Sequence, residues 1–418
     1  MTISGGLPLL STRDMWLLCG GRALQSTIFT AYSGIMPFVA SEWQMSATAS
    51  SSIQSAWHLA YLASLFFAGF LSDRYGAKWV FIRSCVLSCI ATAAFAVLAH
   101  DHLSAMLLYA AIALCAGGSY TPGLALVHQH APPKVRGRYM GFFLAAASAG
   151  YALGLCFIAL AVEAIGWRAG LFAIAAAMVT GAVLCRQAIR KLPLLPVARS
   201  AATGWMTAIR QTVADRSAMK LNWAYTFHCW ELFALWAWMP AFLVYLAGSH
   251  AAAGASTALL LASMAHLLSV AGSVAGGSLS DRFGRAPTIA VIGGIGAAAS
   301  FLAGAASYLP FFLACILFCI YNMTAIADSP VYSTAMAETV PPTRLGVAFS
   351  VRSVMGFGAG ALSPLVFGGI LDSTTLVSRL GTNGSWALAW MSLGLVTVWI
   401  PVMMRARRPL RSGPSASR

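Results

Sequence analysis

Six ionisable side chains interrupt long apolar stretches of this 418-residue sequence. They are Arg22, His58, Glu231, His266, Asp328 and Arg352. An ionisable group at membrane depth costs several kcal/mol unless it is paired or hydrated, so each of these residues marks a candidate site. A guanidinium offers a planar set of donors for a carboxylate or another oxyanion, whereas a desolvated carboxyl or an imidazole can carry a proton. These residue types predict anion binding coupled to proton movement.

Arg22 and Glu231 lie at nearly equivalent places in two apolar runs, 209 residues apart. At 1.5 Å per residue they are about 12 Å and about 18 Å from the starts of their runs. We predict that Arg22 binds the anion and that Glu231 carries the coupling proton near the substrate. Two alternatives remain: Arg22 forms a structural ion pair with another helix, or Glu231 neutralises Arg22 until a proton releases it. Trp230, next to Glu231, could stack on a planar substrate.

Asp328 and Tyr120 precede two prolines, Pro330 and Pro122, that stand 208 residues apart. Proline-interrupted segments at matching points of two halves indicate a transport site. We therefore place Tyr120 and Asp328 in the substrate site and count Asp328 among the proton-coupling residues. A gate or an ion pair between domains is the alternative for Asp328. Arg352 could contact the substrate, pair with Asp328, or brace the charged loops described below.

His58 and His266 are also 208 residues apart, each in the middle of an apolar run. A single histidine in a helix is more often a buried, hydrogen-bonded residue than a titrating one. Two histidines at equivalent positions, with a side chain that titrates near neutral pH, instead suggest a proton-sensing role between the two halves of the chain.

The elements that position these residues are membrane-spanning helices. The chain is 59% hydrophobic and 9% charged, with a mean hydropathy of +0.77, whereas a soluble domain is about 25% charged. We expect an all-α integral membrane protein with twelve transmembrane helices, each long enough to cross about 30 Å of hydrocarbon. The predicted spans are 14–39, 48–71, 77–99, 103–127, 137–160, 166–185, 219–247, 254–279, 286–306, 310–335, 344–371 and 385–404.

The spans divide the chain into four predicted parts. Residues 1–185 form a first six-helix bundle, 186–218 a cytoplasmic linker in which an amphipathic surface helix is one option, 219–404 a second bundle, and 405–418 a basic tail. Of the 26 Lys and Arg residues, 21 fall on the side of the termini, which the positive-inside rule makes cytoplasmic in an inner membrane. Because these residues lie in short gaps between apolar runs, the net charge of +15 does not indicate nucleic-acid binding.

A charged motif between two spans occurs twice. Gly69-Phe70-Leu71-Ser72-Asp73-Arg74-Tyr75-Gly76 recurs as Gly277-Ser278-Leu279-Ser280-Asp281-Arg282-Phe283-Gly284, an offset of 208 residues. The offset is about half the chain length, which indicates two six-helix pseudo-symmetric halves in parallel, with a site between them at mid-depth. The nine cysteines lack histidine or acidic partners at ligand spacing, so we expect neither a metal nor a cofactor, and no nucleophile–base set indicates an enzyme.

Twelve spans, a central basic linker and the duplicated Gly-x-x-x-Asp-Arg-x-Gly loop together resemble the major facilitator superfamily of secondary transporters. Arg136-Gly137 and Gly166-Trp167-Arg168 also match patterns common in that family. The resemblance implies alternating access, with the loops as a conformational latch. The latch residues would be Gly69, Asp73, Arg74, Gly76, Gly277, Asp281, Arg282 and Gly284.

The resemblance further implies that Asp73 lies near the cytoplasmic start of the 344–371 helix, and that Arg74 and Lys78 bridge to neighbouring loops. The Gly-x-x-x-Gly-Pro pattern of drug exporters is incomplete here, because no proline follows Gly150 and Gly154. We therefore predict a monomeric symporter in the lipid bilayer that moves a small organic or inorganic anion with protons. The alternative is a proton-antiport exporter of hydrophobic or cationic compounds, in which Glu231 or Asp328 would meet the cation.

Overall fold

The structure, a computed structural model, describes residues 9–193, 205–249 and 253–405, and the regular elements in these ranges are helices. The α-helices are α1 (Thr12–Ser26), α2 (Ala31–Glu42), α3 (Ala47–Tyr75), α4 (Ala77–Leu98), α5 (His102–Ala116), α6 (Thr121–His130), α7 (Arg136–Val162), α8 (Trp167–Ala188), α9 (Trp205–Ala214), α10 (Arg216–Ser249), α11 (Ala255–Phe283), α12 (Arg285–Gly304), α13 (Phe311–Ala327), α14 (Ser329–Thr339), α15 (Leu345–Leu371), α16 (Thr374–Thr397) and α17 (Trp399–Arg405). Short 3₁₀ turns are η1 (Thr27–Phe29), η2 (Gly117–Ser119), η3 (Pro133–Val135), η4 (Ala306–Tyr308) and η5 (Pro342–Arg344).

These helices make twelve crossings, as the sequence predicts. Within the described residues, 11 helical segments are long and apolar enough to span a membrane, and α1, η1 and α2 together make the remaining crossing. The ends agree with the predicted spans to within about four residues, except at the last span. That span begins at Thr374 rather than 385, because α16 continues through a kink at Gly381, where φ is 70°. The polar residues before the kink hid this first part of the helix from the hydropathy criterion.

The linker between the halves contains one described helix, α9, which packs against α10 and α15. Residues 194–204 of the predicted linker lie outside the described residues. So does the predicted basic tail, apart from Arg405.

The described chain begins beside the end of α6 and ends beside the start of α12, where Met404 packs in the same cluster as Ala290; both places lie at one end of the helix bundle. The amide of Leu10 donates a hydrogen bond to the carbonyl of His130, at the end of α6. We call this the terminal face, and the other end of the bundle the opposite face. Both copies of the Asp-Arg motif, at the ends of α3 and α11, lie at the terminal face.

Two crossings are broken at matching points. The fourth crossing turns through η2 between α5 and α6, and the tenth is interrupted between α13 and α14. Tyr120 and Asp328, 208 residues apart, are the N-cap residues of the second segments, and a proline occupies the first turn that follows each. Because proline lacks an amide donor, a backbone carbonyl beside each of these two residues loses the hydrogen bond that a continuous helix would give it.

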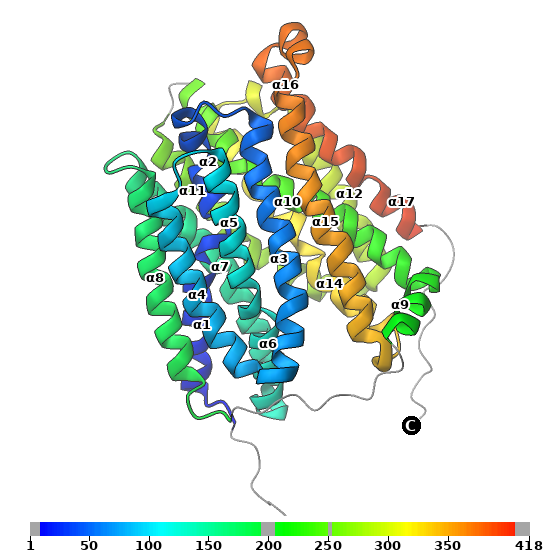
Figure 1. The fold of residues 1–418 in the computed structure, drawn as a ribbon. Helices are drawn as coiled ribbons and strands as arrows, with labels where there is room; N and C mark the ends of the chain where they lie inside the picture. Colours follow the sequence, from blue (N-terminus) through cyan, green and yellow to red (C-terminus); the bar gives the residue numbers. More distant parts are fainter. Residues whose placement is uncertain (1–8, 194–204, 250–252, 406–418) are drawn as a thin grey trace, which may run out of the picture.

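The two halves are joined most closely toward the opposite face. The pairs α3–α15 and α7–α11 form the main contacts between the halves. Ser256 Oγ donates to the Ala159 carbonyl at 2.6 Å, and Ser263 Oγ donates to the Ala152 carbonyl at 2.8 Å. Figure 1 shows α3 and α15 together at the opposite face and diverging toward the terminal face. The structure is therefore closed at the opposite face.

Candidate functional site

Arg22 contacts the break in the fourth crossing. Its Nη1 donates to Ser119 Oγ at 2.9 Å, and its Cζ lies 5.6 Å and 5.4 Å from the ring centroids of Tyr120 and Phe143. The residue is 3% exposed, and among the described residues its Nε has no hydrogen-bond partner and no carboxylate lies within 4.0 Å of the guanidinium. The predicted alternative of a structural ion pair is thus not formed. Arg22 is a buried cation held by aromatic faces and by the hydroxyls of Ser119 and Tyr61.

Arg352 of α15 has the same kind of environment in the second half. Its Nη1 donates to Ser333 Oγ at 3.0 Å, and its Cζ lies 4.5 Å from the ring centroid of Tyr225 and 4.6 Å from that of Phe349. Its Nε also has no partner among the described residues.

Asp328 pairs with a histidine that the sequence reasoning did not select. The Nδ1 atom of His228, on α10, lies 2.8 Å from Asp328 Oδ1, and the side chains are 2% and 3% exposed. The Nε2 atom of His228 hydrogen-bonds with Ser329 Oγ at 3.0 Å. The suggested pairing of Asp328 with Arg352 is therefore wrong, because His228, one turn before the predicted Glu231, reaches the helix break first.

Glu231 is buried inside the second half rather than at the interface. Its Oε2 lies 3.0 Å from where a Cβ on Gly296 of α12 would stand, and the carboxyl approaches Tyr321 of α13 and Thr397 of α16. Glu231 therefore does not neutralise Arg22, and that alternative is wrong for this structure.

The repeat explains why these two residues point in different directions. Trp230, not Glu231, stands 208 residues after Arg22, which is the offset of the duplicated motif. One further residue turns a helical side chain by about 100°. Trp230 is partly buried and packs against the main apolar core, and its indole Nε1 has no hydrogen-bond partner among the described residues.

His58 and His266 lie in an aromatic layer that joins the halves. The His58 ring is 4.5 Å from Phe233 of the second half, and the His266 ring is 6.2 Å from Tyr151 of the first half, centroid to centroid. Tyr151 also contacts Trp236 at 5.3 Å. His266 is 0% exposed, and neither of its ring nitrogens has a hydrogen-bond partner among the described residues. Each histidine thus contacts the half of the chain to which it does not belong.

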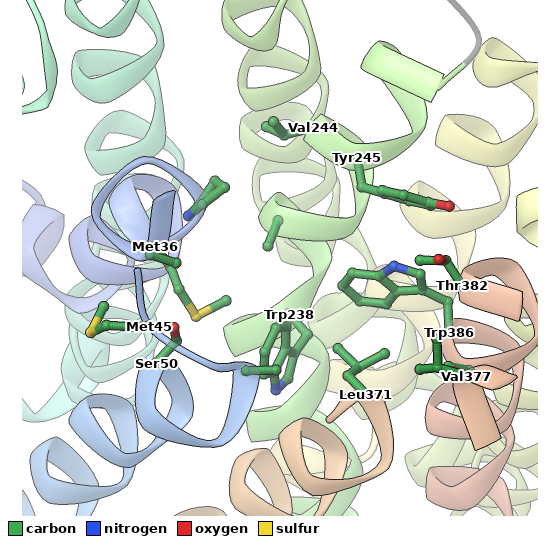
Figure 2. Close-up of a pocket in the computed structure, with 15 residues that line it drawn as sticks. Met36, Met45, Ser50, Trp238, Val244, Tyr245, Leu371, Val377, Thr382 and Trp386 are labelled. Atoms are coloured by element: carbon green, nitrogen blue, oxygen red, sulfur yellow. The ribbon is translucent and has the colours of Figure 1, made fainter. Parts of the chain in front are cut away.

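A cavity of about 350 Å³ lies between the halves, on the side of the opposite face. Figure 2 shows Met36 and Met45 of the first half facing Trp238, with Tyr245 and Trp386 beyond it. The full lining is Met36, Pro37, Ala40, Met45, Ala47, Ser50, Trp238, Ala241, Val244, Tyr245, Leu371, Val377, Thr382, Ser385 and Trp386. All of these residues are uncharged, and none is a predicted site residue. The cavity is therefore separate from Arg22 and Arg352.

Comparison with known proteins identifies the family of the chain. The sequence model described as Major Facilitator Superfamily matches residues 18–364. The chain belongs to this superfamily. It is a multi-pass membrane transport protein and not an enzyme, as the sequence predicts. No curated protein sequence matches the chain.

Solved structures of superfamily transporters share the whole fold at low sequence identity. A D-xylose–proton symporter has a TM-score of 0.77 at 17% identity, covering 96% of this chain and 99% of its own. The nucleoside transporter NupG has a TM-score of 0.75 at 14% identity, covering 94% and 98%. The xylose transporter XylE from E. coli, in an inward-open conformation, has a TM-score of 0.72 at 15% identity, covering 94% and 96%.

The superfamily loop motifs are exposed in this structure. Asp73, Arg74, Asp281 and Arg282 are all exposed at the terminal face, so the implied contact of Asp73 with the start of α15 is not made here. Arg74 instead lies over the neighbouring Tyr75 ring at 5.4 Å.

Residues next to the motifs hold each loop within its own half. Lys78 Nζ donates to the carbonyls of Arg190 and Leu192 at 2.9 Å and 2.6 Å, which is the bridge that the resemblance implies for this residue. In the second half, Arg285 pairs with Asp281 at 2.5 Å and with Glu338 at 2.9 Å. Both contacts stay on the same side of the interface.

Proposed function

We propose that the chain is a proton-coupled secondary transporter of a small organic or inorganic anion that works by alternating access. One observation carries the proposal: each half contributes a guanidinium, Arg22 or Arg352, that lies on aromatic rings beside a hydroxyl and has no carboxylate within 4.0 Å in the part of the chain that the structure describes. Asp328 is engaged by His228, and Glu231 points elsewhere. Within the described residues neither guanidinium is therefore paired with a carboxylate, and an anion would supply the missing counter-charge.

The buried acids and histidines are the proposed proton carriers. Glu231 and Asp328 are each about 97% buried, and a proton removes the cost of holding a carboxylate there. A proton on His58 or His266 would place charge in the aromatic layer, which favours separation of the halves. The D-xylose–proton symporter shares this fold, so the fold is compatible with proton coupling.

The distribution of Lys and Arg supports one orientation of the protein in the membrane. With 21 of 26 Lys and Arg residues on the side of the termini, we place the terminal face in the cytoplasm and the protein in an inner membrane. The closed opposite face then lies outside, and the structure corresponds to an inward-facing state. Exposure of Asp73 and Asp281 supports a role for the duplicated loops as a latch that is released in this state.

Counterflow in proteoliposomes tests the anion site directly. Radiolabelled anions of several classes are exchanged with and without a proton gradient, in the wild type and in Arg22→Ala and Arg352→Ala. Truncating one partner of a buried charge pair costs about 2–5 kcal/mol, so we expect KM for the transported anion to rise at least about 30-fold in each variant. Arg22→Lys should also weaken binding, because an ammonium lacks the planar fork of a guanidinium.

Arg83→Ala is the matched control, because Arg83 is an exposed arginine of α4 whose Cζ lies 5.2 Å from the ring centroid of Trp79. It should leave KM unchanged. Unchanged exchange in Arg22→Ala and Arg352→Ala would sink the anion proposal. Transport of a lipophilic cation with loss in Glu231→Gln or Asp328→Asn alone would instead favour the exporter.

A further inference from the structure

Two acidic residues at the opposite face join the halves in a way that repeats the symmetry of the chain. Glu163 follows the last residue of α7, and Asp372 follows the last residue of α15. They are 209 residues apart. Each carboxyl contacts the first turn of a helix in the other half: α11 for Glu163 and α3 for Asp372.

Asp372 forms the stronger of the two contacts. Its Oδ1 accepts the amide of Ala47 at 2.8 Å, and its Oδ2 accepts the amide of Thr48 at 2.7 Å. These amides are among the four at the start of a helix that have no partner inside it. Ser46 Oγ accepts a third amide of this turn, from Ala49, at 3.2 Å. A residue of the second half thus caps the N-terminus of α3, which belongs to the first half.

Glu163 does the same for α11 with fewer bonds. Its Oε1 accepts the amide of Ser256 at 3.2 Å. The N-cap residue of α11 is Gly254, which has no side chain to cap the helix. A Cβ at that position would stand 2.5 Å from Glu163 Oε1, so the glycine makes room for the carboxylate.

We propose that Glu163 and Asp372 form a paired latch that holds the opposite face closed. Both carboxylates benefit from the partial positive charge at the start of a helix, and both lose that partner when the halves part at this face. The latch acts at the ends of α3 and α11 away from the Asp-Arg motifs. It depends on movement of the halves and not on the identity of the substrate.

The surroundings of both carboxyls lower their pKa values. Hydrogen bonds from the backbone and side chain of Ser256 hold the pKa of Glu163 below its ordinary value. Burial raises the pKa of Asp372, but hydrogen bonds from Thr48, Ala47 and Ser46 outweigh it, so that this pKa is also lowered. The groups described around both carboxyls are backbone amides and hydroxyls, so the helix N-termini are the main source of positive potential.

Thiol alkylation of a buried reporter measures opening of this face. Ser385, which lines the cavity near the opposite face, is 1% exposed, so Ser385→Cys should react with a maleimide only when the halves part. The rate is measured on purified, substrate-free protein, and the rate of the chain without the reporter is subtracted to remove the native cysteines. When opening is fast and rare, the change in rate equals the change in open population.

The two contacts should differ in size. Asp372→Ala removes two short, charge-assisted bonds and should raise the alkylation rate roughly tenfold, whereas Glu163→Ala should raise it about threefold. The double variant should give roughly the product, because the two sites share no partner. Asp372→Asn keeps one acceptor oxygen and should raise the alkylation rate by a smaller factor. It replaces Asp372→Ala in the test if that variant does not fold.

Asp101→Ala is the matched control. Asp101 Oδ1 accepts the amide of Ser104 at 2.7 Å and caps α5 at the same face, but within one half. Its loss should lower thermal stability and leave the alkylation rate unchanged. Equal rates in the wild type and Asp372→Ala, or an equal rise in Asp101→Ala, would overturn the latch. Because no substrate is present, either result leaves the anion proposal untouched.

Discussion

The contact between His228 and Asp328 makes a measurable prediction for stability. The Nδ1 atom of His228 and the Oδ1 atom of Asp328 lie 2.8 Å apart, a separation at which a charged pair would gain about 6 kcal/mol at an effective dielectric constant of about 20. Desolvation of both groups consumes most of that gain, and removing one partner of a buried pair costs about 3–5 kcal/mol. We expect Asp328→Asn to cost about 3 kcal/mol, at the lower end, because the amide keeps an oxygen that can accept a hydrogen bond from the His228 ring.

A double-mutant cycle isolates the pair. The free energy of unfolding is measured by reversible denaturation in mixed micelles for Asp328→Asn, His228→Gln and the double variant. The double variant should be more stable than the sum of the single effects predicts, by about 2 kcal/mol, within the range for residues in direct contact. The cycle needs all three proteins to unfold reversibly, so recovery of the native signal after dilution is the control.

Additive effects, within about 0.5 kcal/mol, would refute the reasoning. They would mean that the two side chains lie near each other without a net interaction. Proton-driven accumulation is the second readout: Asp328→Asn should lose it while retaining exchange at equal pH, because exchange needs no net proton movement.

Three further predictions follow from packing and charge. A methyl group on Gly276 would overlap the carbonyl oxygen of Ala327, whereas Gly277 has nothing within 4 Å; Gly276→Val should therefore abolish folded expression, and Gly277→Val should not, as gel filtration will show. The pKa values of Glu163 and Asp372 are lowered in the closed state, so proton uptake favours the open state. Both contacts should be fully present at pH 7; the Glu163 contact should weaken as pH falls below about 4.5 and the Asp372 contact as pH falls below about 3.8. Because maleimide reacts with the thiolate, the alkylation rate of Ser385→Cys should rise relative to that of an exposed cysteine measured at the same pH. His266→Phe should keep the aromatic layer and exchange within about threefold of the wild type, but flatten the pH dependence of uptake if His266 senses protons; an unaltered pH profile would assign it to packing alone.

The membrane crossings, the helix breaks and the two halves could be predicted from the sequence, because each depends on one physical quantity. Hydropathy located all twelve crossings, since a helix must bury about 20 apolar residues to cross the bilayer. The prolines at 122 and 330 located both helix breaks, because proline cannot donate the amide that a continuous helix needs. The motif offset gave the two halves.

The contacts of individual side chains were harder, because they depend on how each helix is rotated. The offset between Arg22 and Glu231 is 209, one residue more than that of the motif, and the extra residue turns the carboxyl away from the interface. His228 lies one turn before Glu231, and its spacing in the sequence does not distinguish it from the other polar and aromatic residues of that apolar run. Glu163 and Asp372 had a usable signal, namely two acids 209 residues apart just beyond the ends of two predicted spans.

The equivalent positions of Arg22 and Trp230 have a consequence for how a bound ligand is oriented. The two halves are nearly related by a two-fold axis, and a symmetric site would accept a ligand equally well in either of two orientations. Here the first half carries a guanidinium at a position where the second half carries an indole. In the proposed site, a ligand with one charged end and one flat end would therefore have a single preferred orientation between the halves.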